Sequence, residues 1–130
     1  MHNSKSRLEA FSDGMFAIIL TILVLELKVP HLEDGSFAAF SAAIAELAPK
    51  LLSFAFSFFI IAIFWVNHHH LINQIEKVDT KLLWLNIALL FFSCLFPFFT
   101  AFIGDYPSNS FVIALYPLNM TISSVIINTI

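Results

Sequence analysis

The stretch Arg7–Leu27, RLEAFSDGMFAIILTILVLEL, is apolar enough to enter a lipid bilayer, yet it begins with an arginine and two acids and carries Thr21 near its middle. A charged side chain at the centre of a membrane helix costs about 2.5–3.5 kcal/mol on insertion scales, so such groups are rare without a partner or a function. The stretch therefore predicts a membrane-spanning helix whose polar residues have a specific purpose.

The composition of the whole chain agrees with a membrane protein. Hydrophobic residues make up 59% of the 130 residues and charged residues only 12%, whereas a soluble domain is about half apolar and about a quarter charged. The single cysteine, Cys94, excludes an intrachain disulfide and a cysteine-based metal site. The formal charge of −3 gives no reason to expect a nucleic-acid partner.

The apolar runs predict an all-α, polytopic transmembrane bundle, because a helix needs about 20 mostly apolar residues to cross a bilayer. We expect a single membrane domain over residues 1–130. Pro49 predicts a kink in one long second helix rather than a break, and Pro97 predicts a kink in the third. The first run lacks a small-residue cleavage site, so we interpret it as a retained helix and not as a signal peptide. The predicted spans are approximately Leu8–Val29, Phe37–Val66, Leu82–Ile103 and Phe111–Ile130.

Lysine and arginine in the flanking segments predict the orientation. Lys5 and Arg7 precede the first span. Lys77 and Lys81 lie between the second and third spans, whereas the connections on the opposite side, HLEDG and GDYPSNS, contain neither residue type. Lys28 and Lys50 lie toward the opposite side of the membrane in the first and second spans, so the charge asymmetry is incomplete. The balance favours a cytoplasmic N-terminus.

Several residues of the first span share one stripe when the helix is read at 100° per residue. The plain interpretation of the stripe is lipid contact or helix packing, with Thr21 bonded to the carbonyl four residues earlier. Ser12 and Asp13 lie off the stripe, and they either cap the first helical turn or need partners on another helix. The stripe consists of Arg7, Phe11, Gly14, Ile18, Thr21, Ile22 and Leu25.

A second polar cluster, FWVNHHHLINQ, covers Phe64–Gln74 and contains three consecutive histidines at 68–70. Adjacent helical residues point 100° apart, so these histidines cannot share one metal ion. No histidine or carboxylate lies three or four residues away from them, which predicts no metal site and makes an intramembrane metal enzyme the weakest interpretation. We expect instead that one or two of the histidines hydrogen-bond Asp13 or Ser12, with Trp65 packing beside them.

The pattern RxxxFSDxxxA over Arg7–Ala17 resembles the signature that opens the transmembrane protein 175 family of potassium channels. The stretch WVNHH over Trp65–His69 is similar to the second-helix pattern of that family. The likeness covers about the first 105 residues well and the remainder loosely. Bacterial members are six-helix proteins of around two hundred residues, so we expect the family's last two helices to be absent from this chain.

The resemblance implies a bacterial leak channel in the plasma membrane, permeable to K⁺ and other monovalent cations and without a cofactor. It also implies a homotetramer around the first helix, whose side chains form the constriction in place of a carbonyl-lined filter. The lining positions in this chain would be Ile18, Thr21 and Leu25, with Ile22 close by. A ring of Ile18 side chains would form a hydrophobic gate that stops ions by dewetting.

The resemblance further implies that a structural polar network holds the helices together without touching the permeating ion. The members of this network would be Arg7, Ser12, Asp13, Trp65, His68 and His69. The competing hypothesis is a non-conducting membrane assembly or accessory protein that keeps the same fold.

Overall fold

The computed structural model describes residues 2–130, with side chains described from Ser4 onward. Within this part of the chain, four helical segments are long and apolar enough to cross a membrane, which confirms the predicted all-α, polytopic architecture. The helical elements are α1 (His2–Leu23), η1 (Val24–Glu26), α2 (Phe37–Gln74), α3 (Thr80–Cys94), α4 (Phe96–Asp105) and α5 (Ser110–Thr129).

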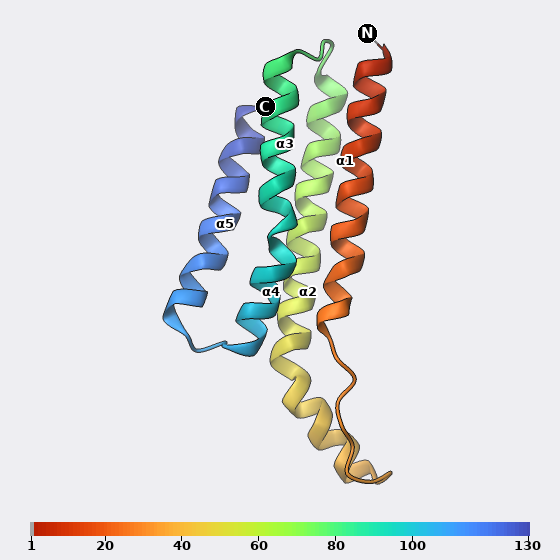
Figure 1. Ribbon diagram of the computed structural model, residues 1–130, viewed down its shortest axis with the longest axis vertical. Helices are drawn as coiled ribbons and strands as arrows, with labels where there is room; N and C mark the ends of the chain where they lie inside the picture. Colours follow the sequence, from red (N-terminus) through yellow and green to blue (C-terminus); the bar gives the residue numbers. More distant parts are fainter. Residues whose placement is uncertain (1) are drawn as a thin grey trace.

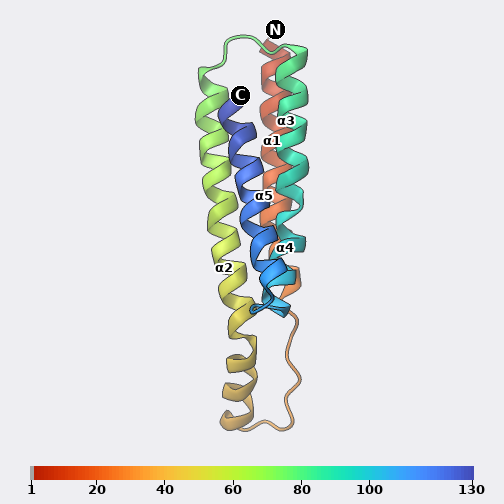
Figure 2. The same cartoon turned by 90° about the vertical axis from the view of Figure 1, so that its left-hand side faces the viewer.

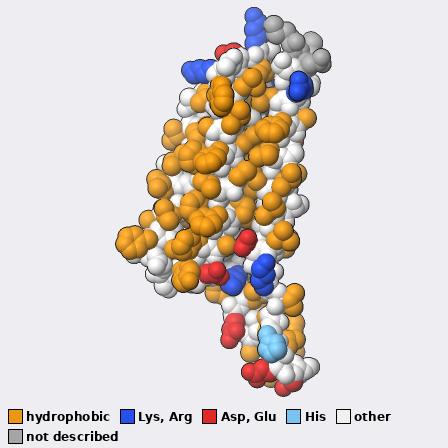
Figure 3. Space-filling model, viewed as in Figure 1, with side chains coloured by type: hydrophobic (Ala, Val, Ile, Leu, Met, Phe, Trp, Pro, Cys, Tyr) orange, Lys and Arg blue, Asp and Glu red, His pale blue; other side chains and the backbone are white. Residues whose placement is uncertain are grey.

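The helices form an up-and-down bundle in which both chain termini and the α2–α3 connection lie at the same end (Figures 1 and 2). α2 packs against α1 and α4, and α5 packs against α3 and α4. Hydrophobic side chains cover the middle of the face seen in Figure 3, and charged side chains gather toward its two ends. This distribution fits a bundle surrounded by lipid, because charges near the bilayer centre are costly.

α2 is one helix of 38 residues that contains Pro49, and its length of about 57 Å exceeds the roughly 30 Å hydrocarbon core of a bilayer. Its N-terminal part bends and projects beyond the other helices (Figure 1). α2 ends at Gln74 rather than at the predicted Val66. The polar stretch stays helical because His68 and Ile72, four residues apart, are both buried against the bundle.

The third span, predicted to kink at Pro97, consists of two helices that meet at Leu95. α3 ends at Cys94 and α4 begins at Phe96. Pro97 has no N–H for the carbonyl of Ser93, and its ring would clash with that carbonyl inside a continuous helix. It occupies the first turn of α4 instead, where a missing N–H is tolerated.

α1 tightens into the 3₁₀ turn η1, and the chain leaves helical structure at Leu27, before Pro30 and before the predicted end at Val29. One face of α1 packs into the bundle, and its buried residues recur every three or four positions. These buried residues are Leu8, Ser12, Phe16, Ile19 and Leu23.

Candidate functional site: the outer face of the first helix

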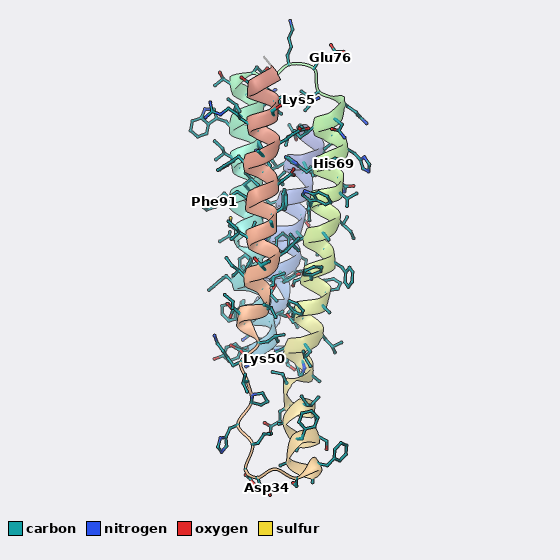
Figure 4. All side chains as sticks on the ribbon, turned by 90° about the vertical axis from the view of Figure 1, so that its right-hand side faces the viewer. Lys5, Asp34, Lys50, His69, Glu76 and Phe91 are labelled. Atoms are coloured by element: carbon teal, nitrogen blue, oxygen red, sulfur yellow. The ribbon has the colours of Figure 1, made fainter. Side chains whose placement is uncertain are left out.

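The stripe read from the sequence is the exposed face of α1. Ile18 is 56% exposed and Leu25 is 62% exposed, whereas the neighbouring Ile19 is only 3% exposed. Thr21 and Ile22 are also exposed. In Figure 4, α1 lies in front, with α2 and α3 behind it on either side. Within the described part of the chain, this face of α1 is therefore not covered by another helix.

Thr21 provides the hydroxyl of this face. Its Oγ1 lies 3.0 Å from the carbonyl oxygen of Ala17 and 2.9 Å from that of Ile18, and it donates its proton to the backbone there. The structure therefore contains the bond from Thr21 to the carbonyl four residues earlier, which the interpretation of the stripe as a lipid-contact or packing face includes. Because the proton points to the backbone, the lone pairs of the exposed oxygen remain available to accept a hydrogen bond or to contact a cation.

Asp13 is joined to α2 by Trp65. The Trp65 Nε1 donates to Asp13 Oδ1 at 2.9 Å. The ring of His69 stacks on Trp65, with centroids 5.7 Å apart and an interplanar angle of 24°. The expected pairing of Asp13 with a histidine was wrong, because the indole occupies the position beside the carboxylate.

His68 points into the bundle and is 2% exposed. Its Nε2 lies 2.7 Å from Asn86 Oδ1, and Asn86 Nδ2 donates to Ser12 Oγ at 3.0 Å. Ser12 Oγ in turn donates to the Leu8 carbonyl at 2.7 Å. Since the Asn86 amide group donates to Ser12, its oxygen accepts and Nε2 of His68 carries the proton.

This chain of hydrogen bonds connects α2, α3 and α1. The expected direct bond from a histidine to Ser12 was wrong, because Asn86 of α3 lies between them. Sequence reasoning missed Asn86, although an isolated amide inside the apolar run Leu82–Ile103 was a signal that could have found it.

Arg7 does not join this network. Its side chain is exposed and lines a groove of about 390 Å³ between α1 and α3, together with Leu83 and Ile87. Among the described side chains, no carboxylate lies within 4 Å of Arg7. The structure therefore brings five of the six predicted network residues together and leaves Arg7 at the edge.

The three consecutive histidines point in different directions, as expected for adjacent helical positions. His68 faces Asn86 and His69 faces Trp65. Among the residues that the structure describes, no group of three or more His, Cys, Asp or Glu side chains is placed to hold a metal ion.

A second buried network lies near the other end of the bundle and was not predicted. Ser57 Oγ lies 2.6 Å from the hydroxyl of Tyr116 and 2.6 Å from the hydroxyl of Thr100. These residues belong to α2, α5 and α4, so the hydroxyl groups connect those helices. Ser, Thr and Tyr are common in apolar helices, and their spacing along the sequence gives no sign that they meet.

Residues 7–97 match the protein family described as the endosomal/lysosomal potassium channel TMEM175. The chain belongs to the TMEM175 family. This confirms the family predicted from the sequence. The matched residues include α1 from Arg7 onward, α2, α3 and the start of α4, and thus all the side chains of the α1 face and of the His68 network.

Two relatives of this chain are named as potassium channels. Potassium channel HX13_20290 from Chryseobacterium sp. (strain P1-3) is 43% identical over 122 residues, which cover 94% of this chain and 60% of that protein. Potassium channel B446_29190 from Streptomyces collinus (strain DSM 40733 / Tue 365) is 39% identical over 104 residues, covering 80% of this chain and 50% of the relative. The chain thus spans between half and two thirds of the length of these relatives.

The crystal structure of a protein described as a lysosomal potassium-selective channel TMEM175 homolog from Chamaesiphon minutus matches with a TM-score of 0.89 at 32% identity. The match covers 98% of this chain and 69% of that one. All three are named as channels and none as an enzyme. This TMEM175-family chain is therefore a polytopic membrane protein.

Proposed function

We propose that the chain forms a potassium-permeable leak channel, a homotetramer in which the exposed faces of four α1 helices surround the pore. The observation that carries the proposal is the exposure of Ile18, Thr21, Ile22 and Leu25 on a helix whose opposite face is buried in the bundle. A face with a regular set of apolar side chains and one hydroxyl suits a narrow pore. The names of the relatives support potassium as the permeant ion.

The lining residues have different roles in this proposal. The Ile18 ring has no polar atom to offer, so it admits or stops a hydrated ion through its width and its wetting. The Thr21 oxygen, oriented by the bonds to its own helix, replaces part of the hydration shell of the ion. Potassium gives up its water more easily than sodium, so weak oxygen ligands at this level favour potassium.

In this proposal the polar network holds the helices of each subunit together and does not contact the ion. Asp13 is bound to Trp65 on the α2 side of α1, and Ser12 is buried against Asn86. Arg7 lies exposed in the groove beside α3, where a neighbouring subunit has access to it.

The proposal places the N-terminus in the cytoplasm and the channel in the plasma membrane. Lys5 and Arg7 of α1 and Lys77 of the α2–α3 connection belong to the end of the bundle where both termini lie (Figure 2). Positively charged residues in short flanking segments favour the cytoplasmic side.

The alternative is a non-conducting assembly with the same fold. Purified chain in liposomes loaded with KCl distinguishes the two, with valinomycin defining the maximal potassium release. We expect potassium to leave protein-containing vesicles and not protein-free ones. Intact, tetrameric protein without potassium flux would favour the non-conducting assembly.

Cysteine accessibility tests which face of α1 meets water. The native Cys94 is exposed and is first replaced with alanine. We expect Ile18→Cys to react with a water-soluble, membrane-impermeant thiol reagent and to lose most of its flux. Ile19→Cys is the matched control, because this adjacent isoleucine is 3% exposed. Reaction at position 19 and none at position 18 would show that the pore lies elsewhere.

Thr21→Val tests the role of the hydroxyl. Valine keeps the shape and removes the oxygen, so we expect the potassium-to-sodium permeability ratio, measured from reversal potentials, to fall by about twofold or more while the pore still conducts. Thr121→Val is the control, because Thr121 is also exposed and bonds the carbonyl four residues earlier, at 2.8 Å. An unchanged ratio in a conducting Thr21→Val channel would mean that this oxygen does not meet the ion.

A further inference from the structure

Lys28 curls back onto the end of the exposed α1 face. Its Nζ donates to the carbonyl oxygen of Leu25 at 3.0 Å, and its side chain is exposed. Leu25 is the last residue of the stripe. A lysine at this position satisfies one of the free carbonyl groups at a helix C-terminus, where a positive charge is favourable.

The ammonium group of Lys28 has no close acidic partner in the part of the chain that the structure describes. Lys50 is paired with Asp105 at 3.0 Å. Glu26 lines a cavity of about 120 Å³ that also includes Lys50 and Asp105. Lys28 lines the same cavity, but no carboxylate oxygen lies within 4 Å of its Nζ.

The remaining acids at this end are Glu46 in α2, one turn before Lys50, and Glu33 and Asp34 in the connection that runs along the projecting part of the molecule. Asp34 lies at its far tip, well below the end of α1 in Figure 4, and Lys50 lies close to that end. Among the described side chains, the Lys28 ammonium bonds the Leu25 carbonyl directly, so a positive charge is held at the end of the exposed α1 face.

We propose that Lys28 forms a ring of positive charge at the Leu25 mouth of the pore and limits the rate at which cations enter there. This proposal rests on the homotetrameric channel described above. Four ammonium groups held beside the Leu25 carbonyls repel an approaching cation before it reaches the constriction. Such repulsion acts over about a Debye length, which is about 30 Å at 0.01 M salt and about 3 Å at 1 M.

The effect of removing the charge therefore depends on ionic strength. In planar bilayers we expect Lys28→Gln to raise the single-channel potassium current about threefold or more in 10 mM KCl and to leave it close to wild type in 1 M KCl. The glutamine amide still donates a hydrogen bond, so the helix end is kept and only the charge is lost. Lys28→Arg keeps the charge and is expected to behave as wild type at both concentrations.

Lys28→Met separates charge from helix capping, because it removes both the charge and the hydrogen bond to Leu25. We expect it to raise the current as Lys28→Gln does. Lys81→Gln is the matched control, since it removes the same charge from an exposed lysine in the first turn of α3, at the opposite end of the bundle. We expect Lys81→Gln to change the current at neither salt concentration.

The proposal is overturned if the current of Lys28→Gln divided by that of wild type is the same at both salt concentrations. That result would leave the proposed channel function in place. The proposal is overturned in the same way if Lys28→Arg raises the current as much as Lys28→Gln. Bilayers in which the wild-type protein carries no potassium current overturn the proposed function, and the role of Lys28 with it.

Discussion

Ile18→Asn is expected to raise the potassium flux of the reconstituted protein by about tenfold or more, because in the proposed tetramer a ring of amide groups would keep water in a constriction that isoleucine would leave dry. A tenfold rise corresponds to a barrier lowered by about 1.4 kcal/mol. Sodium flux should rise together with potassium flux, so that the permeability ratio changes less than in Thr21→Val. Stopped-flow potassium release from liposomes and reversal potentials measure the two quantities.

The control for this variant is Ile63→Asn on α2. Ile63 and Ile18 are both 56% exposed, so the two replacements place the same amide at equally exposed positions on different helices. We expect Ile63→Asn to leave the flux unchanged. An equal rise in both variants would indicate general leakiness of the bundle, and no rise in Ile18→Asn would mean that position 18 is not the gate.

Asn86→Ala is expected to lower the free energy of unfolding by about 2 kcal/mol. The change removes the acceptor for His68 Nε2 and the donor to Ser12 Oγ, both of which are buried. A buried polar group left without a partner costs about 1–3 kcal/mol, and the cavity left by the amide adds to this loss. Single hydrogen bonds between membrane helices contribute less, about 0.6 kcal/mol on average.

SDS titration of the protein in mixed micelles, followed by circular dichroism, measures the loss. Asn128→Ala is the control, because Asn128 is exposed on α5 and makes none of the buried side-chain hydrogen bonds described above. We expect its unfolding midpoint to stay at the wild-type value. Equal midpoints for the two variants would show that the Asn86 bonds contribute little to stability.

The network also predicts coupling between its members. Ser12→Ala and Asn86→Ala should destabilise together by less than the sum of their separate effects, since each removes the same hydrogen bond. Additive effects would show that the two residues stabilise the bundle independently of their contact.

The predicted starts of the second, third and fourth spans lie within two residues of the observed starts of α2, α3 and α5, where Ser36, Asp79 and Asn109 accept hydrogen bonds from the first helical turns. The first helix begins at His2 rather than at the predicted Leu8. The second helix extends past the predicted span end at Val66 to Gln74, because His68 and Ile72 are buried against the bundle.

The all-α membrane architecture follows from the sequence alone, because apolar runs of this length satisfy their backbone hydrogen bonds inside a bilayer only as helices. The sequence also placed the lining candidates on one stripe of α1, since helical spacing is a local property. Tertiary structure alone decided which face of α1 is buried and which partners meet. Trp65 and Asp13 are 52 positions apart, and Asn86 and Ser12 are 74 positions apart. Contacts at such separations arise from the packing of whole helices, which no local pattern encodes.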